Sequence, residues 1–199
     1  MDIEPTEEQQ DGSQKQNLKI FFRDAITIIV IAGVIILGLQ AVIQKFIVDG
    51  PSMNYTLHTG EQLIVNKIVY NIHEPERGDI IVFHPPLQME TDDYIKRIIG
   101  LPGEIVHIKD GVVTIEQPDG AMLVLDEPYV TNIAKRDYDS GVIPEGEYFV
   151  MGDNRTNSSD SRNGWTLDEE SIIGKGWVAI WPISDWGLIP NHDFSSEEE

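Results

Sequence analysis

A run of 20 uncharged residues, 25–44, constrains this chain more than any other feature. The run is rich in Ile, Val and Leu, and as a helix rising about 1.5 Å per residue it covers about 30 Å, the thickness of a bilayer's hydrocarbon core. A cleaved secretory signal has a shorter apolar region, of about 7–15 residues, with a small-x-small cleavage site behind it. Here Lys45-Phe-Ile-Val48 follows instead. We therefore predict one uncleaved transmembrane anchor, which we place at residues 20–47.

The charges beside this run predict its orientation. Lys15, Lys19 and Arg23 precede the run, whereas Lys45 alone follows it closely. The positive-inside rule then places the N-terminus in the cytoplasm and the larger part of the chain outside. Residues 1–19 are polar and acidic without apolar periodicity, so we expect a disordered cytoplasmic tail. The prediction is a single-pass protein of the cell membrane.

Composition excludes several kinds of function. The net charge is −20, and residues 49–199 alone carry ten basic against 28 acidic residues, a net charge of −18. Such a domain repels nucleic acid, so we expect no nucleic-acid binding. The chain has no cysteine, which rules out disulfides and cysteine-based metal or redox chemistry. Its five histidines show no metal-binding spacing, and we expect neither a metal nor a cofactor.

Beyond the anchor, short β-branched and aromatic runs punctuated by Gly and Pro predict strands. Asp110-Gly111 and residues 117–120 predict tight turns between them. Residues 167–173 are the one short helix that we expect in this part. The predicted strands are 63–69, 79–83, 94–99, 104–108, 112–116, 122–125, 148–151 and 177–181.

The fold class is therefore mainly β, with one N-terminal transmembrane helix followed by an all-β ectodomain. We place this extracytoplasmic domain at residues 48–190, with a small inserted subdomain at about 104–146. The acidic residues 191–199 are expected to form a frayed tail.

Two residues far apart in the chain could share one chemistry. Ser52 follows Gly-Pro just beyond the anchor, where a serine is ordinarily a turn residue. Lys96 lies in a predicted strand, and alternation places it on the same face as Tyr94 and Ile98. Burial lowers the pKa of a lysine, and a neutral lysine can take a proton from a serine hydroxyl. The alternative is that Lys96 extends its ammonium group to water along an edge strand.

Residues 151–162 follow a predicted strand and are crowded with hydroxyls, amides, two acids and two arginines. Because buried charges must be paired, Asp–Arg pairs that pin the loop account for much of this composition. A serine of this loop could also accept a hydrogen bond from Lys96 and so orient it. The residues alone do not choose which serine.

Four segments, in this order, resemble the signature boxes of bacterial type I signal peptidases. They are Gly-Pro-Ser-Met-Asn-Tyr-Thr-Leu (50–57), Arg-Gly-Asp-Ile-Ile-Val-Phe (77–83), Tyr-Ile-Lys-Arg-Ile-Ile-Gly-Leu-Pro-Gly-Glu (94–104) and Gly-Asp-Asn-Arg-Thr-Asn-Ser-Ser-Asp-Ser-Arg (152–162). With the anchor, the resemblance covers residues 25–162. The single anchor and the short connection between the last two boxes resemble the compact, Gram-positive-like forms.

The resemblance implies a membrane-bound serine endopeptidase of the Ser-Lys fold that removes signal peptides from exported preproteins at Ala-x-Ala-type sites. Matched position by position, it implies that Ser52 is the nucleophile and Lys96 the general base. It also implies that Ser158 hydrogen-bonds the lysine, and that Asp160 and Arg162 support the site.

The resemblance further implies that Met53 and Tyr94 screen the lysine from water. The substrate segment before the cleavage site is expected to add as a strand along walls that include Val48, Asp93 and Ile95. The implied partners are secreted preproteins and, through the anchor, membrane lipid, with the enzyme working near the secretion translocon.

Two positions depart from the family pattern. Tyr55 stands where proline is usual, and we expect the loss of a fixed φ to loosen the chain behind Ser52, or the tyrosine to pack instead. Restoring proline is expected to leave activity intact or to raise it. Gly50 stands where some members carry a serine that helps to bind the oxyanion. One donor is then expected to be the Ser52 backbone N–H, and the second a backbone group or water.

Two other functions account for part of these features. A self-cleaving repressor of the related Ser-Lys fold needs a DNA-binding segment and a cytosolic domain, and both the anchor and the −18 charge argue against it. An inactive membrane-tethered β-domain that captures exported peptides has only Tyr55 in its support. A separate hypothesis is that Trp177, Trp181 and Trp186 touch the membrane, because aromatic side chains are enriched at bilayer interfaces.

Overall fold

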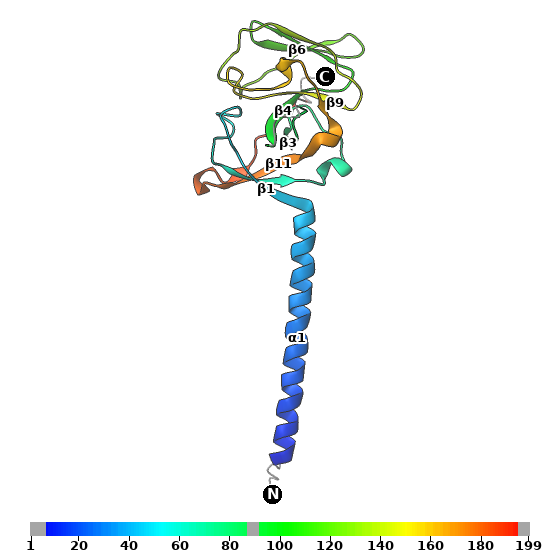
Figure 1. The fold of residues 1–199 in the computed structure, drawn as a ribbon, viewed down its shortest axis with the longest axis vertical. Coiled ribbons are helices and arrows are strands. Elements are labelled where there is room, and N and C mark those ends of the chain that lie inside the picture. The colour runs from blue at the N-terminus through cyan, green and yellow to red at the C-terminus, as the bar shows by residue number, and fades with distance from the viewer. Residues whose placement is uncertain (1–6, 87–91, 195–199) are drawn as a thin grey trace. The chain divides into compact units, whose positions relative to one another are not determined.

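The structure is a computed structural model that describes residues 7–86 and 92–194. It divides into two compact units, residues 1–42 and residues 43–199. The first consists of helix α1, Glu7–Val42 (Figure 1). The helix thus includes residues 7–19 of the expected tail. The expected anchor segment continues beyond the end of the helix, and its residues Ile43–Ile47 form strand β1.

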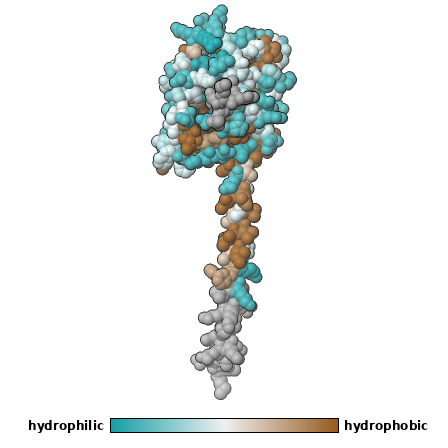
Figure 2. Space-filling view, viewed as in Figure 1, coloured by the Kyte–Doolittle hydropathy of each residue, from teal (hydrophilic) through white to brown (hydrophobic). Residues whose placement is uncertain are grey.

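Residues Lys19–Val42 of α1 have a mean hydropathy of 2.6, and none of this stretch is buried against protein. Its isoleucine, valine and leucine side chains are exposed at successive positions, including Ile28, Ile29 and Val30, and the described part of the helix is largely brown in Figure 2. A helix that is apolar all round belongs in a core or in a membrane. Since none of the stretch 19–42 is buried by the described part of the chain, its length and composition fit a single membrane span.

The second unit is built from two antiparallel sheets. The larger one has the strand order β1-β2-β11-β3-β4-β9-β10, with β12 paired to β11. Its strands are β1 (Ile43–Ile47), β2 (Gln62–Asn66), β3 (Ile80–Phe83), β4 (Tyr94–Gly100), β9 (Glu147–Met151), β10 (Leu167–Asp168), β11 (Ile172–Trp181) and β12 (Gly187–Leu188). The chain therefore folds as the mainly β protein that its sequence predicts.

The smaller sheet has the order β7-β6-β5-β8 and lies at the end of this unit opposite β1 (Figure 1). Its strands are β5 (Ile105–Lys109), β6 (Val112–Glu116), β7 (Met122–Val124) and β8 (Tyr138–Val142). The sheet falls within the stretch expected as an inserted subdomain. Asp110 and Gly111, with φ of 50° and 84°, form the predicted turn between β5 and β6. Gly120 N–H donates to Gln117 C=O over 2.8 Å in the second predicted turn.

The predicted helix at 167–173 is wrong. Leu167–Asp168 is strand β10, Glu169–Ser171 is a short 3₁₀ turn, and β11 begins at Ile172. Strands β1, β8 and β12 were not predicted either. The remaining short 3₁₀ turns are Val69–Asn71, Ser161–Asn163 and Ile183–Asp185.

A group of buried apolar side chains lies beneath the segment that follows β1. It contains Val48, Met53, Leu57, Leu63 and Ile80, of which none is more than 4% exposed. Burying side chains of this size stabilises each by about 1.5–3 kcal/mol. Met53 directly follows Ser52, and Leu57 lies in the same loop. Because both are buried in this group, the group fixes the Ser52 turn to the larger sheet.

Candidate active site

Ser52 lies in a compact loop closed at its base by two backbone hydrogen bonds. Val48 N–H donates to Glu61 C=O over 2.9 Å, and Gly60 N–H donates to Val48 C=O over 2.8 Å. Within the loop, the Met53 carbonyl accepts from Leu57 N–H over 2.8 Å. The side chain of Met53 is completely buried, so the residue beside Ser52 anchors the loop.

Strand β4 brings Lys96 to this serine. Lys96 Nζ lies 2.8 Å from Ser52 Oγ and donates to the Ile95 carbonyl over 2.9 Å. The lysine is 4% exposed, and its Nζ lies 4.9 Å from the centre of the Tyr94 ring. β4 is paired on both sides, with β3 and β9. The alternative of an edge-strand lysine reaching into water does not fit this position.

The loop after β9 holds Ser52 from the other side. Asn154 N–H donates to the Ser52 carbonyl, and its Nδ2 donates to the Pro51 carbonyl, each over 3.0 Å. Gly152 lies so close that a Cβ there would be 2.4 Å from the Ser52 carbonyl oxygen and 2.3 Å from Ser158 Oγ. Only glycine permits this approach. The loop therefore fixes the backbone of the Ser52 turn directly.

The structure places Ser158 beside Gly152, with its Oγ buried. Ser158 lowers the pKa of the nearby Asp160 carboxyl, yet its Oγ has no hydrogen-bond partner of normal geometry within residues 7–86 and 92–194. The hydrogen bond to Lys96 that the family pattern implies is not formed. Ser158 thus lies close to Ser52 and Asp160, with no hydrogen bond to Lys96.

Asp160 and Arg162 tie the ends of this loop together. Asp160 accepts from Gly152 N–H over 3.1 Å, and two nitrogens of Arg162 donate to its carboxylate, each over 2.8 Å. Burial by itself would raise the pKa of Asp160, but the hydrogen bonds and charge of Arg162 outweigh it and hold that pKa below its ordinary value of 3.8. Asp160 thus holds the Gly152 N–H directly, and Arg162 contributes by fixing the Asp160 carboxylate. Gly152 itself lies against the Ser52 carbonyl oxygen.

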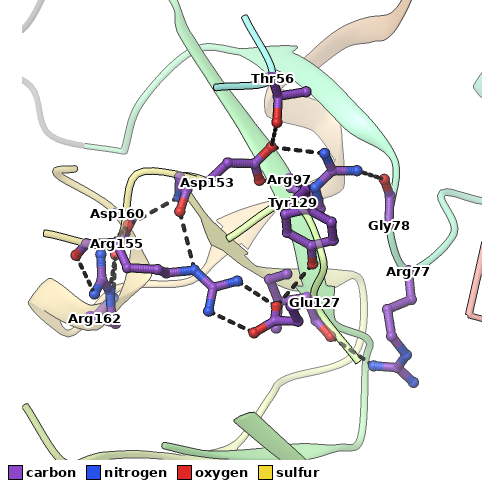
Figure 3. A network of polar contacts seen from close by, with 12 residues as sticks. Thr56, Arg77, Gly78, Arg97, Glu127, Tyr129, Asp153, Arg155, Asp160 and Arg162 are labelled. Carbon is purple, nitrogen blue, oxygen red and sulfur yellow. Dashed lines mark hydrogen bonds and ion pairs between the residues drawn. The ribbon is translucent and has the colours of Figure 1, made fainter. Parts of the chain in front are cut away.

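Sequence reasoning missed a second charged residue of β4. Arg97 is fully buried on the face opposite Lys96, where its Nε and Nη2 donate to the Asp153 carboxylate over 2.9 and 2.8 Å (Figure 3). Its Nη1 donates to the Gly78 carbonyl over 2.8 Å. Asp153 also accepts a hydrogen bond from Thr56, in the Ser52 loop. The signal was available, since alternation places Arg97 on an apolar face, where a charge requires a partner.

Four arginine–carboxylate pairs of this kind surround the site, with arginine side chains at most 11% exposed. They are Arg77–Glu104, Arg97–Asp153, Arg155–Glu127 and Arg162–Asp160. Of the Asp–Arg pairs expected to pin the loop 151–162, Asp160–Arg162 forms within the loop. Asp153 pairs with Arg97 of β4, and Arg155 pairs with Glu127, far away in the sequence.

A cleft of about 590 Å³ opens beside Ser52 and Lys96. One wall is formed by residues 46–51, which comprise the end of β1 and the segment after it. The other wall is formed by residues 92–95. The three expected substrate-binding residues, Val48, Asp93 and Ile95, all line it. Asp93 also pairs with His84, whose Nδ1 lies 2.6 Å from its carboxylate. Ser52 and Lys96 line the same cleft between these walls.

Tyr55 adopts a conformation that proline cannot. Its φ is 83°, whereas the proline ring holds φ near −65°. Together with the hydrogen bond from Thr56 N–H to the Met53 carbonyl, this φ is that of the third residue of a type II turn. The tyrosine ring is 56% exposed. This backbone conformation argues against the expectation that restoring proline leaves activity intact or raises it, which stays a prediction to be tested.

Gly50 also has a positive φ, of 89°, and a Cβ there would touch nothing within 4 Å. A serine at this position would have room but would be strained. Gly50 thus supplies this left-handed conformation at the point where the cleft wall leads to Ser52.

Residues 21–181 match the family model described as signal peptidase, peptidase S26. The chain belongs to this family. It is 36% identical over 182 residues to the probable signal peptidase I-1 of Synechocystis sp. (strain ATCC 27184 / PCC 6803 / Kazusa), covering 87% of this chain and 90% of the relative. It is also 36% identical over 191 residues to signal peptidase I T of Bacillus subtilis (strain 168), covering 90% of this chain and 94% of the relative.

A crystal structure of a signal peptidase I from Enterococcus faecalis V583 is 35% identical, covers 52% of this chain and 97% of that one, and aligns with a TM-score of 0.44. Family membership confirms the resemblance read from the four boxes. In this member of the S26 family the matched boxes meet in space: the first supplies Ser52, the third Lys96, and the fourth the loop that clamps the serine backbone.

Proposed function

We propose that this chain is a membrane-anchored serine endopeptidase that removes signal peptides from exported preproteins, with Ser52 as nucleophile and Lys96 as general base. The observation that carries the proposal is the 2.8 Å contact between Lys96 Nζ and Ser52 Oγ at the floor of a peptide-sized cleft. A buried amine flanked by an aromatic ring loses hydration in its charged form, which favours the neutral base.

The chemistry follows from this contact. Neutral Lys96 takes the Ser52 hydroxyl proton while Oγ attacks the carbonyl carbon of the residue before the cleavage site. The tetrahedral intermediate collapses, the Lys96 ammonium returns the proton to the departing amine, and the mature protein leaves. Lys96 then deprotonates a water that hydrolyses the ester on Ser52, which releases the signal peptide with a free carboxylate. An oxyanion donor contributes about 3–4 kcal/mol, and the Ser52 N–H is the first candidate.

The substrate is proposed to bind as an added strand between residues 46–49 and residues 92–95. Main-chain hydrogen bonds then give affinity, and we propose that small pockets beside Val48 and Ile95 select Ala-x-Ala. Ser158, Asp160 and Arg162 support the loop behind the nucleophile. Val48 and Ile95 lie in the same cleft as the dyad, which supports this assignment.

Helix α1 is proposed to cross the cell membrane with its N-terminus in the cytoplasm and the β unit outside. Anchoring confines enzyme and membrane-threaded substrate to one surface, so their effective concentration is high without tight binding. The same geometry favours work close to the secretion translocon. External protease added to intact cells, after removal of any outer barrier, should digest the β unit; its protection would reverse the orientation.

The test uses full-length protein in detergent or lipid and a preprotein whose signal ends in Ala-x-Ala. N-terminal sequencing of the product should show cleavage directly after that motif. A matched preprotein with tryptophan at the last signal position should remain uncut, because the proposed pocket for that position accepts only a small side chain. Binding of the preprotein without cleavage, at every pH and lipid composition tried, would favour the peptide-capture alternative instead.

A further inference from the structure

The stretch 126–132, between β7 and β8, reaches from the small sheet to the site; we call it the strap. We propose that Glu127 of the strap is a positioning residue for Ser52, acting through Arg155 and Gly152. This role rests on the proposed function, because it concerns the placement of the nucleophile for that reaction. Neither the dyad nor the cleft walls include Glu127.

The first link is a buried two-point ion pair. Arg155 Nη1 donates to Glu127 Oε2 over 2.7 Å, and Nη2 contacts Oε1, with side chains only 5% and 8% exposed (Figure 3). Tyr129, also in the strap, donates its hydroxyl to Glu127 Oε1 over 2.9 Å. A bidentate pair fixes direction as well as distance. The guanidinium plane of Arg155 is thereby set by Glu127.

The second link runs from Arg155 to the loop that clamps the serine. Arg155 Nε donates to the Gly152 carbonyl over 3.2 Å. Gly152 in turn is wedged between the Ser52 carbonyl oxygen and Ser158, with no space even for a methyl group. A movement of the Gly152 peptide is therefore transmitted to the backbone of Ser52.

The strap also contacts the residue next to Lys96 on β4, on the opposite face of that strand. The Tyr129 ring lies 4.0 Å from the guanidinium carbon of Arg97, the neighbour of Lys96 on β4. Asn132 Nδ2 lies 3.5 Å from Asn154 Oδ1 and 3.4 Å from the Tyr55 hydroxyl. One short segment thus contacts β4, the clamping loop and the Ser52 loop. A buried ion pair is weak support for stability, so accurate placement is the better reason for Glu127.

A positioning role predicts a particular kinetic signature. The cleft walls at 46–51 and 92–95 make no contact with Glu127 among the interactions of the described residues, so substrate binding should persist when it is changed. A displacement of about 1 Å in a reacting group can cost about 100-fold in rate. The effect should therefore fall on kcat and leave KM nearly unchanged.

The experiment compares full-length Glu127→Gln, Glu127→Asp and Glu116→Gln in detergent with the wild type, on one preprotein. Glu116 is the matched control, a glutamate of the small sheet that pairs with His107 rather than with an arginine of the site. We expect Glu127→Gln to lower kcat by about 10- to 100-fold with KM within about twofold. Glu127→Asp keeps the charge with a shorter side chain, and its kcat should lie between those of the wild type and Glu127→Gln. Glu116→Gln should match the wild type.

Tryptophan fluorescence at the assay temperature gives the folded fraction of each variant. A folded Glu127→Gln enzyme with wild-type kcat would overturn the positioning role, as would losses that only follow the folded fraction. If Glu127→Gln does not fold, Glu127→Asp decides, and wild-type kcat there overturns the role. Absence of cleavage by the wild type would instead remove the proposed function and this role with it.

Discussion

Lys96 and Arg97 are neighbours in β4, point to opposite faces and are held in opposite ways. Arg97 is fully buried against the Asp153 carboxylate and remains a charged structural residue. Lys96 contacts a hydroxyl, a carbonyl and an aromatic ring. A guanidinium does not lose its proton in proteins, whereas an ammonium group can when it is buried. At the residue scale, these two environments suit Lys96 to its proposed role as base and Arg97 to a structural role.

Tyr55 allows a direct test of the Ser52 turn. Because a non-glycine residue at positive φ costs of the order of 1–3 kcal/mol, Tyr55→Gly should remove strain and retain cleavage activity. Tyr55→Pro cannot adopt a φ of 83° and should destabilise the protein by about 1–3 kcal/mol and lower kcat. Thermal unfolding and preprotein cleavage of both full-length variants measure the two effects. A proline variant as stable and active as the wild type would show that the turn has another conformation.

At the element scale, the strands with clear alternation or apolar runs were predictable, and those without were not. Strand β4 is apolar over most of its length, whereas β8 reads Tyr-Asp-Ser-Gly-Val and carries no such pattern. The helix predicted at 167–173 failed because β11 extends as far as Ile172 and pairs there with Phe83. Tertiary pairing overrides local preference in such short segments.

The site was predictable in part for the same physical reason. Its dyad lies in two segments with distinctive residues, whereas the ion pair of Glu127 and Arg155 joins positions 28 residues apart in the chain, in two loops. Local pattern carries no information about which glutamate meets which arginine. The fold supplies that pairing by bringing the strap against the loop after β9.

The small sheet contains a histidine clasp with a defined pH dependence. On β5, His107 Nε2 lies 3.0 Å from Glu116 on β6, and Nδ1 lies 2.8 Å from Asp139 on β8. The hydrogen bond with Glu116, and then that with Asp139, raises the pKa of His107 above its ordinary 6.5. A raised pKa contributes stability that is complete below pH 6.5 and is lost as pH rises through the higher folded value. The Gly141 N–H, and then His107, lowers the pKa of Asp139 below 3.8. The stability that the Asp139 carboxylate contributes is therefore lost only as the pH falls below 3.8.

His107→Gln should therefore lower the melting temperature most between about pH 4 and pH 6.5, by about 1–3 °C, because exposed pairs are weak. At pH 9 the variant and the wild type should melt together. Melting of the full-length protein in detergent at pH 5.5 and pH 9 makes the comparison. A difference that is equal at the two pH values would show that the charged imidazole is not involved.

At the scale of the whole molecule, the apolar helix fits a membrane anchor, and the acidic β unit holds the candidate active site. The β unit nevertheless exposes large apolar side chains on β11, β12 and the turn between them. They are Trp177, Trp181, Ile183, Trp186 and Leu188, each at least 50% exposed. Clusters of this kind mark interaction surfaces, and tryptophan favours the bilayer interface. We expect this patch to lie in the lipid headgroup region.

Fluorescence of the full-length protein in nanodiscs tests this expectation. Lipid with brominated acyl chains should quench the wild type, because three of the four tryptophans lie in the patch. Replacing Trp177, Trp181 and Trp186 by phenylalanine leaves Trp165, which packs against Phe83 in the core and should not be quenched. Equal, negligible quenching of both proteins would remove the patch from the membrane.

The measurement that bears most directly on the central claim is a mutant cycle on Ser52 and Lys96. Full-length wild type, Ser52→Ala, Lys96→Ala and the double variant are compared on one Ala-x-Ala preprotein, with folding checked for each. If the two residues form one catalytic unit, each single change should abolish cleavage, by about 10⁴-fold or more, and the double variant should be no worse. Cleavage that survives Ser52→Ala, or losses that add independently, would contradict a Ser-Lys dyad at this site.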